Sequence, residues 1–311
     1  MPTAAGPRRH PSAVPAGPGR PIMNWLLVAA LAAAGLVVGW GLRTVVFHLA
    51  VPLDEPPARA CPACGHEILA AGRSPGPARS PARLSQAAPS QAAPSQAAPS
   101  QAAPFRPAPF RPALFRPALS PAGRCRACRA RIGPAPLAVE LVTAALFGGL
   151  AARVHPPGLL AAACWLAGCA VALAWIDAAV QRLPDALTAA AYAGTVGFLV
   201  LAAASSGDWR DLVRAVLGGL ALAAAYLALA VISRSALGLG DVKLAASLGT
   251  LTAWPGWRTL VAGAFAGFLL GAVYGAGLLV LRRAHRGQRI PFGPFMVAGA
   301  FLALLASAVP G

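Results

Sequence analysis

Long apolar stretches separated by short polar segments dominate the chain. Eight of them predict membrane helices, because about 20 mostly apolar residues cross the hydrocarbon core of a bilayer. Their predicted bounds are 24–42, 136–152, 158–176, 185–204, 212–232, 242–254, 259–281 and 291–309. The stretch at 242–254 is short for a full span, so we expect it to be tilted, partial or continuous with Gly238–Asp241. The predicted fold is an all-α polytopic membrane protein with about eight transmembrane helices.

One long polar segment interrupts this pattern. Residues 43–134 are the predicted loop between a first helix at 24–42 and a helical bundle at 135–311. Within it, residues 85–119 hold four copies of Ser-Gln-Ala-Ala-Pro and three pentads that begin Phe-Arg-Pro-Ala. Such short, proline-rich repeats cannot build a core, so we expect disorder or polyproline II there. Residues 1–23 are an N-terminal tail in which Met23 resembles a natural start, so the preceding residues are a candidate misassigned extension.

Charge adds an orientation to the pattern. The chain is 57% apolar and 11% charged, and 12 of its 26 basic residues lie between Arg43 and Arg131. Basic residues beside membrane spans favour the cytoplasmic side, so we expect the long loop in the cytoplasm. The net charge of +17 is not gathered in a soluble basic domain, which argues against nucleic acid as a partner. The expected location is the inner (cytoplasmic) membrane of a bacterial cell, with the lipid bilayer as the surroundings.

Two Cys-x-x-Cys pairs flank the repeats. Cys61, Cys64, Cys125 and Cys128 supply the four thiolates of a tetrahedral ion, so the spacing predicts a structural zinc site. Their long separation weakens this prediction only slightly, because the entropic cost of closing a loop grows slowly with its length. Disulfides are the alternative, and a reducing cytoplasm disfavours them. The loop is therefore predicted to be of a zinc-binding type.

Two aspartates stand beside apolar stretches in a chain with only nine acidic residues. An ionisable group near bilayer depth is costly and is a functional candidate, which applies to Asp177 and Asp241. Gly238 and Gly240 precede Asp241 and allow close backbone approach. The predicted topology places both aspartates at the cytoplasmic edge, where two carboxylates that meet can share a proton and activate water. Alternatively, Asp177 is an interfacial residue paired with Arg182.

The candidate supporting residues are Gly238, Gly240, Lys243 and Glu140. Lys243 either lies near enough to the aspartates to bias them or extends to the membrane interface. Glu140 stands early in the second apolar stretch of the chain and is expected to face a polar interior. Asp185 follows a proline and precedes an apolar run, so it is predicted to start a helix.

Three classes of function fit these features. The first is an intramembrane aspartic protease. The second is an ion- or proton-coupled transporter in which Asp177 and Asp241 act as a relay. The third is a zinc-anchored membrane scaffold in which the aspartates are structural. The position of both acids at one membrane face, rather than at the midplane, favours the protease over the relay.

The motifs together resemble the prepilin peptidases, the type IV leader peptidases of the GxGD aspartic protease family. The resemblance covers most of 35–308. The shared stretches are the two cysteine pairs, Val139–Thr143, Asp177 with Leu183–Thr188, Gly238–Leu244 and Ile290–Phe295. It implies that Asp177 and Asp241 are the catalytic pair. It also implies a prepilin or pilin-like secretion protein as substrate, cut after its basic leader at the cytoplasmic face. Separately from the resemblance, the membrane and Glu140 or Glu67 are candidate contacts for that leader.

The chain departs from the family in its early stretch. The family pattern G-S-F-x-N-V-V-I-x-R-L-P is replaced by Gly39-Trp40-Gly41-Leu42-Arg43-Thr44-Val45-Val46-Phe47-His48-Leu49, in which the expected Asn and the Arg-Leu-Pro ending are absent. Many members also methylate the new amino terminus with S-adenosylmethionine, and this stretch is associated with that activity. The prediction therefore covers peptide cleavage and does not extend to methylation or to S-adenosylmethionine as a cofactor.

Overall fold

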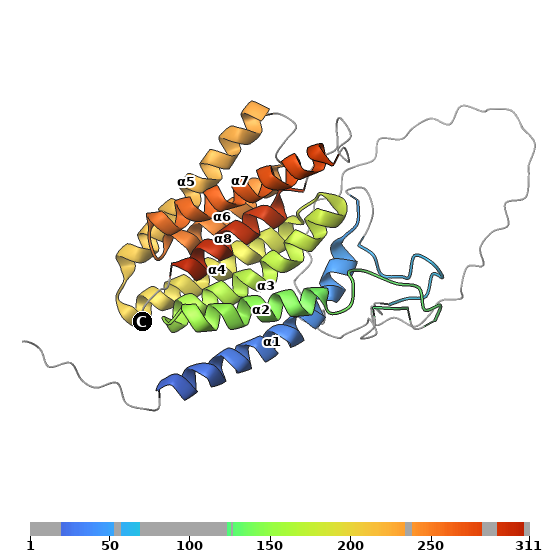
Figure 1. Ribbon diagram of the computed structural model, residues 1–311, viewed down its shortest axis with the longest axis horizontal. Coiled ribbons are helices and arrows are strands. Elements are labelled where there is room, and N and C mark those ends of the chain that lie inside the picture. The colour runs from blue at the N-terminus through green and yellow to red at the C-terminus, as the bar shows by residue number, and fades with distance from the viewer. Residues whose placement is uncertain are drawn as a thin grey trace, which may run out of the picture.

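The computed structural model describes residues 20–52, 57–68, 123–125, 127–233, 238–281 and 291–307. These residues form eight α-helices and no strand longer than an isolated bridge (Figure 1). The helices are α1 Arg20–Leu49, α2 Ala138–Arg153, α3 Pro157–Val180, α4 Asp185–Ser206, α5 Trp209–Ser233, α6 Leu239–Ala253, α7 Trp257–Val280 and α8 Gly293–Ala306. The predicted all-α fold is confirmed. The repeats at 85–119, the tail before residue 20, Arg234 and the arginines between 282 and 289 lie outside the described residues.

Helix ends follow local sequence signals. Pro157 is the first residue of α3, where its fixed φ and missing N–H cost nothing. Asp185 lies in the first turn of α4, directly after Pro184, as the sequence predicted. At the other end of α3, Gln181 adopts a left-handed conformation with φ 51° and donates its N–H to the Asp177 carbonyl. This cap turns the chain sharply between α3 and α4.

Five of the eight helices, α1, α3, α4, α5 and α7, are long and apolar enough to cross a membrane. The other three, α2, α6 and α8, have 16, 15 and 14 residues. The expectation of eight spans is thus correct for the number of helices, while three of them are shorter than a full span. Most residues of α6 and α8 are buried against other helices, so these two are held by protein contacts along most of their length.

The helices run side by side in one bundle, with α1 along one edge and α5 and α7 along the other (Figure 1). Helix α3 lies inside and contacts α1, α2, α4, α6 and α8. Because successive helices reverse direction, the cysteine segments lie at the same end as the α3–α4 turn and the first residues of α6 and α8. That end carries every candidate site residue.

Candidate functional site

Asp177 lies in the last turn of α3 and is 6% exposed. Its Oδ2 accepts a hydrogen bond of 2.9 Å from the backbone N–H of Gly293, the first residue of α8. A helix N-terminus offers unpaired N–H groups and a partial positive charge, and both stabilise a carboxylate. A Cβ at position 293 would lie 2.8 Å from the same oxygen, so only glycine allows this approach. Gly293 lies within the Ile290–Phe295 motif, but the sequence alone predicted no role for it.

Asp241 is the third residue of α6 and is 8% exposed. Its Oδ2 accepts a hydrogen bond of 3.0 Å from the backbone N–H of Gly238, the residue that precedes the helix. Gly240 packs against Leu183, since a Cβ at position 240 would lie 2.8 Å from the Leu183 Cβ. Gly238 and Gly240 therefore have different structural roles. Gly238 holds the Asp241 carboxylate, and Gly240 lets the start of α6 close onto the turn that follows Asp177.

The structure brings the two carboxylates to the same end of the bundle. Helices α3 and α6 are in contact, and Asp177 and Asp241 lie close enough for their charges to repel. Repulsion between two buried carboxylates is relieved when one of them carries a proton. Each carboxylate has a backbone N–H donor on one oxygen, which fixes its orientation. This arrangement has the parts needed to hold and activate a water molecule.

The charged residues around the pair have partners of their own. The Lys243 ammonium lies 2.6 Å from Asp185 Oδ1, in an ion pair of which both side chains are exposed. This contact joins the start of α4 to α6. Arg182 donates to the Pro52 carbonyl at 3.1 Å, and the described partner of Asp177 is Gly293 rather than Arg182. The ion pair of Lys243 is therefore with Asp185, a neighbouring acid that neither of the two predictions for Lys243 included.

Glu140 forms a buried ion pair with Arg43. The Arg43 Nη1 and Glu140 Oε1 atoms are 2.9 Å apart, and the side chains are 1% and 8% exposed. The pair joins α1 to α2, and Arg43 also packs beside Gly123, close to the second cysteine pair. Glu140 does face a polar contact inside the bundle, as expected. Glu67, the other candidate for leader contacts, is exposed beside the first cysteine pair.

The four cysteines of the two Cys-x-x-Cys pairs form one cluster, with all four Sγ atoms within 4.8 Å of one another. The two pairs fold alike. Gly65 N–H donates to the Cys61 carbonyl at 2.9 Å, and Arg129 N–H donates to the Cys125 carbonyl at 3.0 Å. Each turn has one residue at positive φ, Gly65 at 70° and Arg129 at 61°. Cys61 and Cys125 are buried on Phe47 and Ile132, while the second cysteine of each pair is exposed.

The spacing of the sulfurs fits a tetrahedral ion. Sγ of Cys61 lies 3.7 Å from Sγ of Cys128, and Sγ of Cys64 lies 3.7 Å from Sγ of Cys125. Four thiolates about 2.3 Å from a central zinc ion stand about 3.8 Å apart. A disulfide has sulfurs about 2.05 Å apart, and the four cysteines are free. The cluster can therefore hold one metal ion, as the sequence predicted.

The thiols of the cluster differ in acidity. Backbone N–H groups of Cys128 and Ala127 lower the pKa of the Cys125 thiol to about 6. A backbone N–H of His66 also favours the Cys64 thiolate, but the neighbouring thiol of Cys128 and burial together raise the pKa of Cys64 to about 12. Cys125 is therefore the more acidic of these two thiols.

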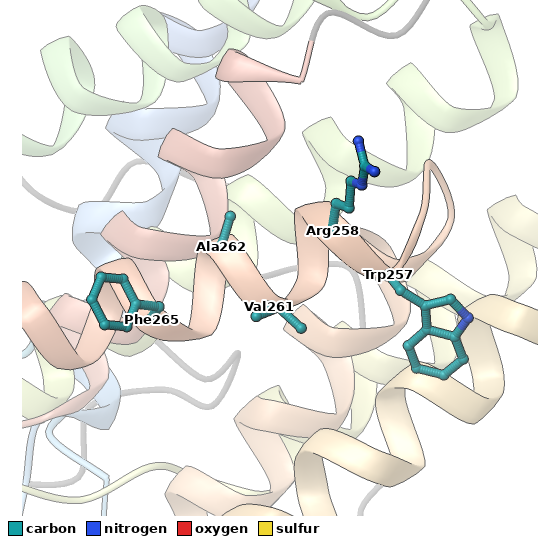
Figure 2. Close-up of a pocket in the computed structure, with 5 residues that line it drawn as sticks. All are labelled: Trp257, Arg258, Val261, Ala262 and Phe265. Atoms are coloured by element: carbon teal, nitrogen blue, oxygen red, sulfur yellow. The ribbon is translucent and has the colours of Figure 1, made fainter.

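A hollow of about 460 Å³ lies elsewhere, on the first turns of α7. Trp257, Val261, Ala262 and Phe265 line it, with Arg258 beside them (Figure 2). Three of these side chains, Trp257, Val261 and Phe265, are about half or more exposed. The hollow lies at the end of the bundle opposite the aspartates and has an apolar lining. Neither Asp177 nor Asp241 is among the residues that line it.

Comparison with known proteins gives a family for part of the chain. Residues 164–276 match the model of the "Type IV leader peptidase family". This segment contains both Asp177 and Asp241. No solved structure matches the chain.

Several curated relatives share the name "Prepilin leader peptidase/N-methyltransferase". The protein of Aeromonas salmonicida is 37% identical over 188 residues, which are 59% of this chain and 62% of that relative. The protein of Pseudomonas aeruginosa is 36% identical over 192 residues, with the same two coverages. The alignments thus span less than two thirds of the relatives' length.

The apolar helices and these relatives together make the chain a multi-pass membrane protein. The resemblance to the prepilin peptidases, stated from the sequence motifs, is confirmed, since residues 164–276 match the type IV leader peptidase family and these relatives carry the prepilin leader peptidase name.

Proposed function

We propose that this protein is a membrane aspartic endopeptidase that removes the basic leader from type IV prepilins or pilin-like secretion proteins. The observation that carries the proposal is the pair of buried carboxylates, Asp177 and Asp241, at one end of the bundle. Each receives a backbone N–H from a glycine that begins or precedes a helix. The family segment and the relatives' printed names support the substrate class.

The chemistry uses one ionised and one protonated aspartate. The ionised carboxylate takes a proton from water as the water oxygen attacks the scissile carbonyl carbon. The protonated carboxyl group donates to the carbonyl oxygen, which gives a tetrahedral gem-diol. Transfer of a proton to the amide nitrogen then breaks the C–N bond and releases the leader as a carboxylic acid and the mature chain as an amine. The protons belong to the pair, so the two roles are not assigned to single residues.

The site position supports cleavage at the cytoplasmic face. Asp177 lies in the last turn of α3 and Asp241 in the first turn of α6, so both stand near a membrane boundary. The basic cysteine segments lie at the same end, and basic residues favour the cytoplasm. A basic leader that precedes an apolar substrate helix would reach this end from the cytoplasm. A relay for ion transport would instead need acids near mid-membrane.

We further propose that the cysteine cluster holds a structural zinc ion. The tetrahedral spacing of the sulfurs supports zinc, and the closed set of four thiolates leaves no open position for substrate. The ion would supply folding energy to the cysteine segments. Peptide cleavage itself needs no step at this cluster.

Co-expression with a prepilin tests the peptidase. The wild type is expected to shorten the prepilin to its mature size, and Asp177→Asn and Asp241→Asn are each expected to abolish processing while still entering the membrane. Asp208→Asn, in the turn at the opposite end, is the matched control and should process normally. Full processing by either of the first two variants would disprove the proposed pair. The mass of the mature amino terminus also reports whether a methyl group is added.

A further inference from the structure

A cluster of three aromatic rings includes Phe292, the residue directly before the glycine that holds Asp177. The ring centroids of Tyr226 and Phe268 are 5.4 Å apart, those of Tyr226 and Phe292 are 6.1 Å apart, and those of Phe268 and Phe292 are 5.2 Å apart. Phe292 immediately precedes Gly293, whose N–H holds Asp177. The cluster therefore joins α5 and α7 to the backbone that orients one of the two aspartates.

The packing of α5 on α6 carries Tyr226 toward the other aspartate. The two helices run antiparallel through small residues. Gly218 packs against Ala253, and a Cβ at Gly249 would lie 3.0 Å from the Leu222 Cβ. From Gly218 to Leu222 the chain advances four residues along α5, and the facing residue moves back four along α6, from Ala253 to Gly249. Four more residues along α5 lead to Tyr226, which therefore faces α6 one helical turn from Asp241.

Tyr226 is an unusual residue for that place. It is 2% exposed, and it is the only tyrosine among the buried residues that the structure describes. A buried tyrosine hydroxyl normally finds a hydrogen-bond partner. The register of α5 on α6 makes the Asp241 carboxylate, one helical turn away, the candidate partner of this hydroxyl. An apolar ring would fill the aromatic cluster equally well, so the packing alone does not explain the hydroxyl.

We propose that Tyr226 is a third catalytic group, whose hydroxyl donates a hydrogen bond to the water held between Asp177 and Asp241. The proton stays on the tyrosine, so the group orients the water oxygen and carries no charge through the reaction. Its place on the membrane side of the pair leaves the cytoplasmic side open to the substrate peptide. This inference rests on the proposed peptidase function and adds a residue to it.

The chain offers a matched control for this role. Tyr274, on α7, also stacks on a phenylalanine, with its ring centroid 5.2 Å from that of Phe295. Its side chain is about half exposed, and Phe295 belongs to α8. Tyr274→Phe and Tyr226→Phe therefore remove the same atom from two similar ring pairs. Only the second removes it beside the aspartates.

Steady-state cleavage of a prepilin by the purified full-length protein tests the proposal. Tyr226→Phe is expected to lower kcat by about 10- to 100-fold and to leave KM and the thermal unfolding midpoint near those of the wild type, because only a hydrogen bond to the reacting water is lost. Tyr274→Phe should leave kcat within about twofold. Affinity for a peptide inhibitor with a hydroxyl in place of the scissile carbonyl should fall in parallel with kcat/KM for Tyr226→Phe.

Two outcomes would overturn the inference. One is a Tyr226→Phe variant with a kcat close to that of the wild type, and the other is an equal loss of kcat in both phenylalanine variants. Tyr226→Leu separates ring from hydroxyl, because it should lose thermal stability as well as kcat. Absence of cleavage by the wild type would instead reject the peptidase function itself, so the two failures are distinguishable.

Discussion

The aspartate pair and the cysteine cluster lie at the same end of the bundle, and each joins segments that are far apart in the sequence. They are held in opposite ways. The aspartates repel each other and are kept together by helix packing, glycine contacts and backbone N–H donors. Among the described residues, the cysteine segments share a small core of four buried side chains, Phe47, Cys61, Cys125 and Ile132, so the proposed ion would supply most of their cohesion. The helix bundle therefore positions the aspartates, whereas the folding of the cysteine segments depends on their own proposed metal site.

Metal removal should show this difference most strongly. A chelator, or Cys61→Ser combined with Cys125→Ser, is expected to release about one zinc ion per chain and unfold the two cysteine segments, since structural zinc supplies about 10 kcal/mol or more to small metal folds. Hydrogen exchange should show protection lost in 57–68 and 123–132 and kept in α3 and α6. Equal loss of protection in those helices would remove the distinction between the two regions. Cys164→Ser, in α3, is the control and should keep its metal.

Breaking the buried ion pair between the two regions should have the next largest effect. Arg43→Met leaves the Glu140 carboxylate buried beside an apolar side chain and is expected to cost about 3–5 kcal/mol of stability. Adding Glu140→Leu should recover most of that loss, because two apolar side chains replace the pair without a buried charge. Unfolding midpoints in detergent measure both. An Arg43→Met variant as stable as the wild type would show that the pair does not join α1 to α2.

The glycine contact to Asp177 can be tested by a single methyl group. Gly293→Ala places a Cβ about 2.8 Å from Asp177 Oδ2 and should lower cleavage by about 100-fold, or about 2.7 kcal/mol, by displacing the carboxylate. Gly277→Ala, in α7, serves as the control, because a Cβ at this position would meet no atom within 4 Å. Similar activities for the two variants would mean that the Gly293 contact does not orient the aspartate.

The exposed pair of Lys243 and Asp185 should matter least. Lys243→Met is expected to change cleavage by about twofold or less, because exposed ion pairs contribute about 0–1 kcal/mol. The difference from the wild type should shrink further as salt is raised. A loss of more than about tenfold would place Lys243 within the catalytic machinery after all.

The sequence predicted the helices better than the contacts between them. The apolar pattern located all eight helices, because burial in lipid or protein demands long apolar runs. It ended the first helix at Leu42, whereas α1 continues to Leu49, because Arg43 is paired with Glu140 and can lie inside the bundle. These two residues are 97 positions apart, and no local pattern connects them.

In the candidate site, too, local patterns were predicted and contacts between distant segments were not. The cysteine spacing predicted the cluster directly, since each Cys-x-x-Cys turn is a local structure. The aspartates were found by their cost near a membrane and by the neighbouring motifs. The contributions of Gly293, Leu183 and Tyr226 depend on how α5, α6 and α8 pack, and single residues of these types are common in apolar helices. Only the coordinates distinguish them.

The short helices have a consequence for the surrounding lipid. At 1.5 Å per residue, α6 and α8 are about 21–22 Å long, while α3 and α7 are about 36 Å long. Both short helices begin at the aspartate end, beside the last turn of α3, so they stop short of the level that α3 reaches at the opposite end. Lipid around that opposite end would thin to reduce the hydrophobic mismatch. Membranes with longer acyl chains should therefore strain the contacts of α6 and α8 with α3, and cleavage should fall as acyl-chain length rises.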